Sequence, residues 1–205
     1  MGLTKLFSDL SSASRPQSGA YEQPSVLSIH KNKKQKGSDV VPYGPAPVGG
    51  PGMYFAKTSS SKRPNIRLYK YGQQEVFTSS DHTWSGKIDL MVNGQPMDMK
   101  ASQLSGNCSI YHPRLGELKW KVPQLIGTTA HLSDSQGTQI ATLKSNKVRG
   151  MGQKVIELHV PCDSMFLDLV VGTAFAVMKA NKELAEGAME VGVAGIEGAV
   201  AVATS

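Results

Sequence analysis

Cysteine, catalytic motifs and N-terminal apolar runs are all scarce in this chain. Its 205 residues include two cysteines, Cys108 and Cys162, too few for a disulfide framework or a four-thiolate metal site within one chain. The N-terminal residues contain no apolar run of signal-peptide length, so we do not expect secretion. We therefore expect a cytoplasmic protein with reduced thiols.

Metal-binding and catalytic patterns are missing as well. No histidine belongs to an HxH or HExxH pattern, and Cys108 and His112 could share a metal only on a helix, which Pro113 opposes. Asp81 and His82 follow two serines, but catalytic triads are defined by geometry, and adjacent loop residues usually form a turn. The glycine-rich segments do not continue as phosphate loops. We expect no metal, no cofactor and no enzymatic activity.

Positive charge is concentrated in the first third of the chain. Residues 1–70 contain eleven Lys or Arg and three acidic residues, whereas residues 71–205 contain eleven and thirteen. The densest run holds Lys31, Lys33, Lys34 and Lys36. It predicts binding to anionic lipid headgroups or to a protein partner, or nuclear import, and the alternative is a solvated patch. No aromatic residue interrupts the run, which makes nucleic acid an unlikely partner.

A second basic group surrounds an expected hairpin near residue 150. It contains Lys144, Lys147 and Arg149, with Lys154 beyond the turn. These side chains could contact phosphates at a membrane surface, and the alternative is an ordinary charged hairpin tip.

Residues 1–52 have the composition of a flexible arm. They are rich in Ser, Pro, Gly, Gln and Lys, and residues 42–52 contain four prolines and four glycines. Such a segment buries too little apolar surface to offset its ordering entropy. We expect a flexible basic arm over residues 1–52 and a folded domain over residues 53–186.

The folded domain begins as a series of short strands. We expect strands at Met53–Thr58, Asn65–Tyr71, Glu75–Thr78, Lys87–Val92, Gln95–Lys100, Cys108–Tyr111, Glu117–Val122, Thr128–Ser133, Gln139–Lys144 and Lys154–Val160. Asn93-Gly94 predicts a tight hairpin, because both residues tolerate positive φ. In the last strand, alternation places Ile156, Leu158 and Val160 on one buried face. No helix separates these strands, so we expect a mainly β fold, an antiparallel barrel or sandwich.

One apolar helix is expected after the strands, over residues 163–186. Asp163 can cap its N-terminus, and between Met165 and Met178 only Asp168 and Thr173 are polar. Fourteen helical residues span about 21 Å, less than the roughly 30 Å hydrocarbon core of a bilayer. We therefore expect no transmembrane span but a helix buried inside the barrel, with a poorly ordered Gly/Ala/Val-rich tail over residues 187–205.

Asp168 is the ionisable residue inside this apolar stretch. Such a carboxylate can reach the barrel mouth, pair with a base or have a raised pKa. We favour a position where the helix enters the barrel, which also suits the positive end of the helix dipole. Its role is otherwise left open by the sequence.

Three stretches resemble parts of one known fold. They are a strand entry at residues 116–120 (GELKW), a hairpin at residues 132–141 (LSDSQGTQIA) and the helix from Asp163 to Met178. With the order of elements, they resemble the tubby C-terminal-like superfamily, which includes the LURP-one-related proteins and phospholipid scramblases, over residues 53–185. The small single-domain members are the nearest comparison. The resemblance implies a twelve-stranded β-barrel around a central hydrophobic helix.

The resemblance also implies a ligand. Tubby proteins hold phosphoinositide headgroups through basic side chains on the barrel wall, which makes Lys62, Arg63, Arg67 and Lys70 candidate binding residues. Scramblase activity is not implied, because the chain after Gly187 lacks the bulky apolar residues of a membrane span and its cysteines are not clustered.

We expect a non-enzymatic binding or regulatory protein that associates peripherally with anionic, phosphoinositide-containing membranes. Two alternatives remain open: an adaptor for a protein partner with no lipid role, and a small-molecule carrier or enzyme that uses the barrel mouth. The expected location is the cytoplasm, with the membrane surface and the nucleus as further locations.

Overall fold

The computed structural model describes residues 25–43, 53–70, 74–82, 85–102, 105–122, 129–148 and 151–202. For residues 146–148, 151–153 and 184–202 it describes the backbone alone. The statements below refer to these parts of the chain.

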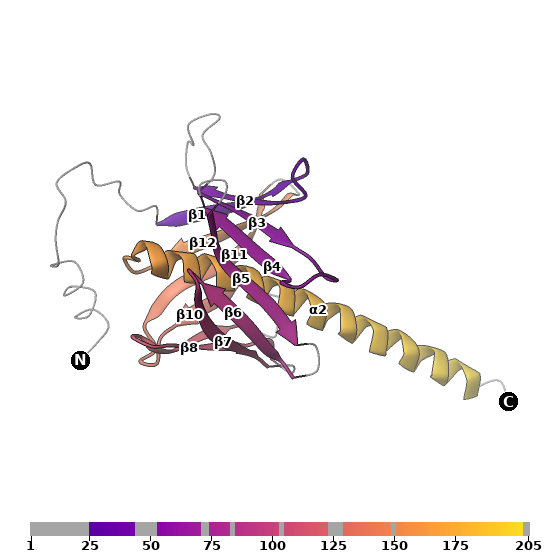
Figure 1. Cartoon of the computed structure of the whole chain (residues 1–205). Helices are drawn as coiled ribbons and strands as arrows, with labels where there is room; N and C mark the ends of the chain where they lie inside the picture. The colour runs from indigo at the N-terminus through magenta and orange to yellow at the C-terminus, as the bar shows by residue number, and fades with distance from the viewer. Residues whose placement is uncertain are drawn as a thin grey trace, which may run out of the picture.

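Twelve antiparallel strands close into a barrel around one helix (Figure 1). The strands are β1 (Val26–Asn32), β2 (Gly37–Pro42), β3 (Tyr54–Thr58), β4 (Ile66–Lys70), β5 (Gln74–His82), β6 (Lys87–Val92), β7 (Gln95–Ala101), β8 (Cys108–His112), β9 (Gly116–Lys121), β10 (Ala130–Ser133), β11 (Gln139–Val148) and β12 (Met151–Leu158). Each pairs with its neighbour in sequence, and β12 pairs with β1 to close the barrel. The helix α2 (Ser164–Val202) passes through the middle.

The ten expected strands correspond to β3–β12, so the prediction of a mainly β fold with an antiparallel barrel is confirmed. The turn between β6 and β7 has positive φ at Asn93 (48°) and Gly94 (79°), as the hairpin prediction requires. Ile156 and Leu158 lie in the core, and Val160 is half-buried and packs against it.

The expected arm over residues 1–52 is wrong for residues 26–42, which form β1 and β2. Their buried side chains are few: Leu27, Ile29 and Val40 face the interior, while lysines occupy the connecting turn. The pairing that fixes β1 is distant in sequence, since Leu27 lies opposite Ile156. Local composition therefore hides the two strands, and the barrel domain begins at Val26.

The helix lies inside the barrel, as predicted. Asp163 caps its N-terminus by accepting a hydrogen bond from the Phe166 backbone N–H (2.7 Å). Apolar side chains from every turn between Phe166 and Val177 are buried against the inward face of the sheet. The segment Ser164–Glu183 is long and apolar enough to cross a membrane, but 67% of its apolar window is buried in the protein. The protein's own sheet encloses this stretch.

The expected end of the helix is wrong, because α2 continues beyond residue 186 to Val202. Figure 1 shows this part projecting from the barrel. Glycines weaken a helix, but the buried turns have already nucleated this one, so each added residue gains a hydrogen bond without a new nucleation cost.

The two ends of the barrel differ. At the entry end α2 begins, beside the β6–β7 and β8–β9 turns. At the exit end α2 leaves, and Lys179 contacts Asp81 near the end of β5. Because the strands alternate in direction, the β1–β2 and β3–β4 turns lie at the exit end, as do the C-terminal ends of β5, β7, β9 and β11.

Candidate anion-binding surface

The β1–β2 turn carries the densest basic run to the exit end. The Asn32 side chain organises the turn, because its Oδ1 accepts the Gln35 N–H (3.0 Å) and its Nδ2 donates to Asp39 (2.9 Å). Lys36 has positive φ (52°), so the chain reverses sharply at the tip. The side chains of Lys31, Lys33, Lys34 and Lys36 are all exposed.

The β3–β4 turn supplies further cations. Ser59 Oγ accepts the Lys62 N–H (3.0 Å), and the buried Asn65 side chain donates to the Ser59 carbonyl (3.4 Å), which holds the loop over the end of the strands. Lys62 and Arg63 are exposed at its tip. On β3, the exposed Lys57 ammonium lies 5.6–5.7 Å from the Tyr69 and Phe55 rings, a cation–π contact on the outer wall.

Strand pairing places these two turns side by side. The order β1-β2-β3-β4 around the barrel makes their hairpins neighbours at the same end. We define the basic rim as the exposed cations on them: Lys31, Lys33, Lys34, Lys36, Lys57, Lys62 and Arg63. Six of these seven residues are candidates by their sequence pattern, whereas Lys57 belongs to no basic run.

Asp39 on the β1–β2 hairpin accepts a hydrogen bond from Asn32, and further acidic residues at the exit end pair with cations outside the rim. Lys179 binds both Asp81 and Glu183, and Lys87 binds Asp89 (3.1 Å) and Asp98 (3.3 Å). Within the described residues, no ion pair involves a member of the basic rim. The rim therefore keeps a net positive charge.

Positive charges at the exit end also affect the pKa of Lys154 on β12. Partial desolvation, together with the positive charges of Lys182 on α2 and Lys31 on β1, lowers the pKa of the Lys154 ammonium. These three cations come from three elements that meet where the helix leaves the barrel.

Two other candidate cations, Arg67 and Lys144, lie outside the rim. Arg67 forms an exposed ion pair with Glu75 (2.8 Å), which raises the Arg67 pKa, and Lys144 pairs with Glu157 (2.6 Å) on the outer wall. The backbone of Lys147 lies near the exit end on β11, but its side chain is outside the described residues, as is all of Arg149.

Lys70 does not join a surface cluster, because its side chain is buried inside the barrel. Its ammonium donates to Asp168 Oδ1 (3.0 Å) and to Ser164 Oγ (2.6 Å). Asp168 also accepts from the Tyr54 hydroxyl (2.7 Å) and from Asn93 Nδ2 (3.1 Å). Asp168 lies near the helix entry as expected, but it does not emerge at the barrel mouth: it is buried and paired with a base and two neutral donors from the wall.

This buried cluster fixes the helix rather than forming an open site. A second polar contact between the helix and the barrel wall lies further along α2, where Thr173 Oγ1 accepts a hydrogen bond from Trp120 Nε1 (3.1 Å). Both polar residues of the apolar stretch thus pair with the barrel wall. Trp120 is a core residue. Among the described residues, no group of three or more metal-ligating side chains comes together.

Comparison of the chain with models of protein families, with curated proteins and with solved structures finds no match. The closed barrel around a helix has the architecture that the tubby-like resemblance implies. Membership of that superfamily stays a prediction.

Proposed function

We propose that this protein binds the surface of anionic membranes through the exit end of its barrel. The observation that carries the proposal is the convergence of the basic rim on two adjacent hairpins, with no acidic partner among the described residues. Each Lys or Arg close to an anionic membrane contributes about 1 kcal/mol of binding free energy. Seven cations would thus suffice for reversible, salt-sensitive attachment.

The form of the rim favours a lipid surface over the other anionic partners. Five of its cations stand on the two turns, and Lys31 and Lys57 lie on the adjoining strand ends, so a broad charged surface can meet them together. The aromatic rings nearest to it, Phe55 and Tyr69, lie under Lys57, so they offer no open face for nucleobases. The role is binding rather than catalysis, since no catalytic constellation accompanies the rim in the described part of the chain.

Vesicle co-sedimentation tests the proposal. The wild-type protein should bind phosphatidylserine- or phosphoinositide-containing vesicles at low salt, and the K33Q/K34Q variant should bind roughly thirtyfold more weakly, from the loss of about 2 kcal/mol. Screening predicts that added salt weakens the wild-type protein more than the variant.

The matched control is R114Q/K144Q, which removes the same charge away from the rim. Arg114 lies on the β8–β9 turn at the entry end, and Lys144 is already paired with Glu157. This control should bind like the wild-type protein. Equal binding to neutral vesicles at high salt would refute the proposal, and equal losses in both double variants would assign the effect to net charge alone. A rim that matters only for a protein partner would leave vesicle binding unchanged in K33Q/K34Q.

A further inference from the structure

A second basic feature lies across the barrel from the rim, on β7, β8 and β9. A cavity of about 350 Å³ opens on the outer wall beside the β7–β8 loop. Its lining includes three lysines from two strands, Lys100, Lys119 and Lys121, together with Ser102, Ser105 and Ser109. These lysines form no basic run in the sequence, because strand pairing brings them together.

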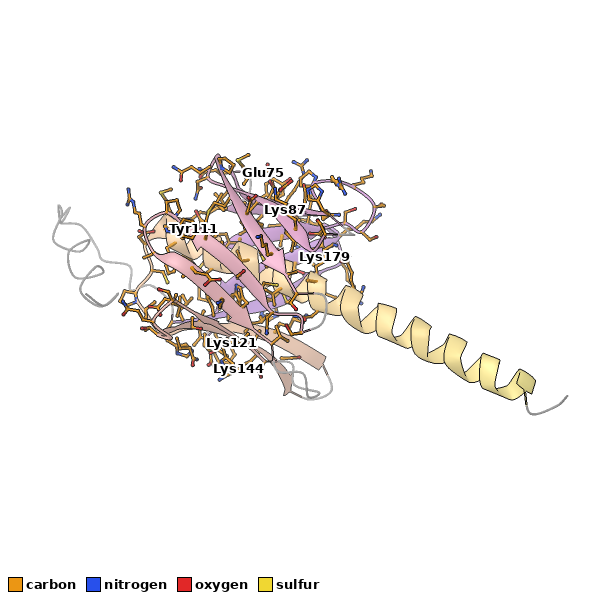
Figure 2. The ribbon with its side chains drawn as sticks, turned by 90° about the horizontal axis from the view of Figure 1, so that it is seen from below. Glu75, Lys87, Tyr111, Lys121, Lys144 and Lys179 are labelled. Carbon is orange, nitrogen blue, oxygen red and sulfur yellow. The ribbon has the colours of Figure 1, made fainter. Side chains whose placement is uncertain are left out.

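The strand register sets the spacing of the cations. Ser109 on β8 lies opposite Lys100 on β7 and opposite Lys119 on β9, so the two lysines flank the serine on the outer face. Lys121 follows two residues after Lys119 and therefore points to the same side. Figure 2 labels Lys121 on the barrel wall, on the same side as Lys144. Three ammonium groups thus border one cavity.

The charge of the cavity is only partly compensated. Lys119 pairs with Glu117 (3.0 Å), but within the described residues no ion pair involves Lys100 or Lys121. Lys100 and Lys119 lie on strands separated by β8, so they share one outward face without forming a directly opposed pair. The net charge of these four side chains is therefore positive.

The β7–β8 loop adds hydrogen-bond donors. Ser102 Oγ accepts the Ser105 N–H (3.2 Å), and Ser105 Oγ accepts the Asn107 N–H (3.3 Å). A hydroxyl that accepts one hydrogen bond keeps its own proton for donation. The described residues on either side of the loop are joined by a backbone hydrogen bond, since the Gly106 N–H donates to the Ser102 carbonyl (2.9 Å).

We infer that this cavity binds a phosphate monoester whose carrier is not aromatic. A tetrahedral dianion offers acceptor oxygens in several directions, which suits ammonium groups and hydroxyls arranged around one space. The cavity exceeds the roughly 30 Å³ share of a single water several times over, which leaves room for the carrier. The aromatic residue in the lining, Trp120, is buried and bonded to Thr173, so it offers no face for a base. This site stands on its own observations and does not depend on the basic rim.

Isothermal titration with glycerol 3-phosphate tests the site, with glycerol as the uncharged control. The wild-type protein should bind the phosphate ester and not glycerol. K100Q/K121Q should weaken binding by roughly a hundredfold or more, since each of the two charged hydrogen bonds contributes about 1.5 kcal/mol or more. E117Q should tighten it, because Lys119 is then released from its carboxylate. All these side chains are on the outer wall, so the variants should fold, which circular dichroism checks.

A parallel arm with phosphatidic acid vesicles distinguishes a lipid headgroup from a soluble ligand. Binding of glycerol 3-phosphate in solution supports a soluble ligand, whereas binding to vesicles alone that K100Q/K121Q weakens supports a headgroup. The inference is overturned if neither form binds, or if K100Q/K121Q binds both forms like the wild-type protein. The K33Q/K34Q variant should leave glycerol 3-phosphate binding unchanged. Failure of the membrane proposal and failure of this site therefore give different results.

Discussion

At the residue scale, Asp168 and Lys70 form an ion pair in the interior of the barrel. Each group is almost wholly buried, and removing one partner from a buried ion pair leaves the other charge uncompensated. We predict that Asp168→Asn lowers the free energy of unfolding by about 3 kcal/mol in urea denaturation. Lys70→Met/Asp168→Asn should recover part of the loss.

The matched surface control is Asp98→Asn, whose carboxylate pairs with Lys87 at an exposed position. It should change the free energy of unfolding by less than about 0.5 kcal/mol. If Asp168→Asn and Asp98→Asn change the free energy of unfolding equally, the stabilising role assigned to Asp168 is contradicted.

His112 gives the stability a pH dependence. Burial, followed by the charge of Arg114, lowers the pKa of His112 below its usual 6.5, although Asp163 opposes the shift. Its Nδ1 also accepts hydrogen bonds from the Arg114 and Leu115 N–H groups (both 3.2 Å), which needs the neutral ring. The unfolded chain takes up a proton near pH 6.5 and the folded chain only below that, so the free energy of unfolding falls as pH decreases below 6.5.

The variant His112→Asn tests this dependence, because its Oδ1 can accept the same backbone hydrogen bonds without titrating. Denaturation measured across that pH range should show a smaller fall for the variant than for the wild-type protein. Identical pH profiles would contradict the role assigned to the imidazole.

At the element scale, the fit of α2 inside the barrel depends on one glycine. A Cβ at position 172 would overlap the Phe77 ring, which lies against the helix backbone. Alanine favours a helix by about 1 kcal/mol over glycine, but overpacking costs about 1–3 kcal/mol. We predict that Gly172→Ala is destabilising in thermal denaturation and that adding Phe77→Leu makes it less so. A stabilised single variant would show that the ring yields without cost.

The elements differ in how far the sequence predicts them. The hairpin at Asn93-Gly94 and the helix cap at Asp163 depend only on residues close by in sequence. Both were predicted from the sequence, and both predictions are confirmed. The strand β1, in contrast, cannot be predicted from its own residues. It is stabilised by pairing Leu27 with Ile156, and its exposed lysines give it the composition of a flexible segment.

In the candidate surfaces, too, some features can be predicted from the local sequence and others depend on strand pairing. The run from Lys31 to Lys36 is visible in the sequence, whereas its approach to Lys62 depends on which strands become neighbours. Lys70 looks like a member of that group by spacing, yet strand alternation turns it inward to Asp168. The lysines of the β7–β9 cavity are separated in sequence, so only the register brings them together.

At the scale of the whole molecule, the barrel has one end suited to an anionic surface. The entry end presents the start of α2 and an apolar cavity of about 180 Å³, with Arg114 as the cation in its lining. The exit end presents the basic rim and the projecting part of α2. Binding should therefore orient the molecule, and a label at either end should report which one meets the lipid.

The most direct test is depth-dependent quenching of a fluorophore attached at Gln35 or Tyr111. Gln35 is at the tip of the β1–β2 turn, and Tyr111, 69% exposed, is on β8 near the entry end (Figure 2). In a Cys162→Ser background the remaining Cys108 is buried, with its pKa raised by burial to about 12, so it should not react. We predict that lipid-borne quenchers in anionic vesicles quench the label in Gln35→Cys and leave that in Tyr111→Cys unchanged. Equal quenching at both positions, or quenching at position 111 alone, would contradict membrane binding through the exit end.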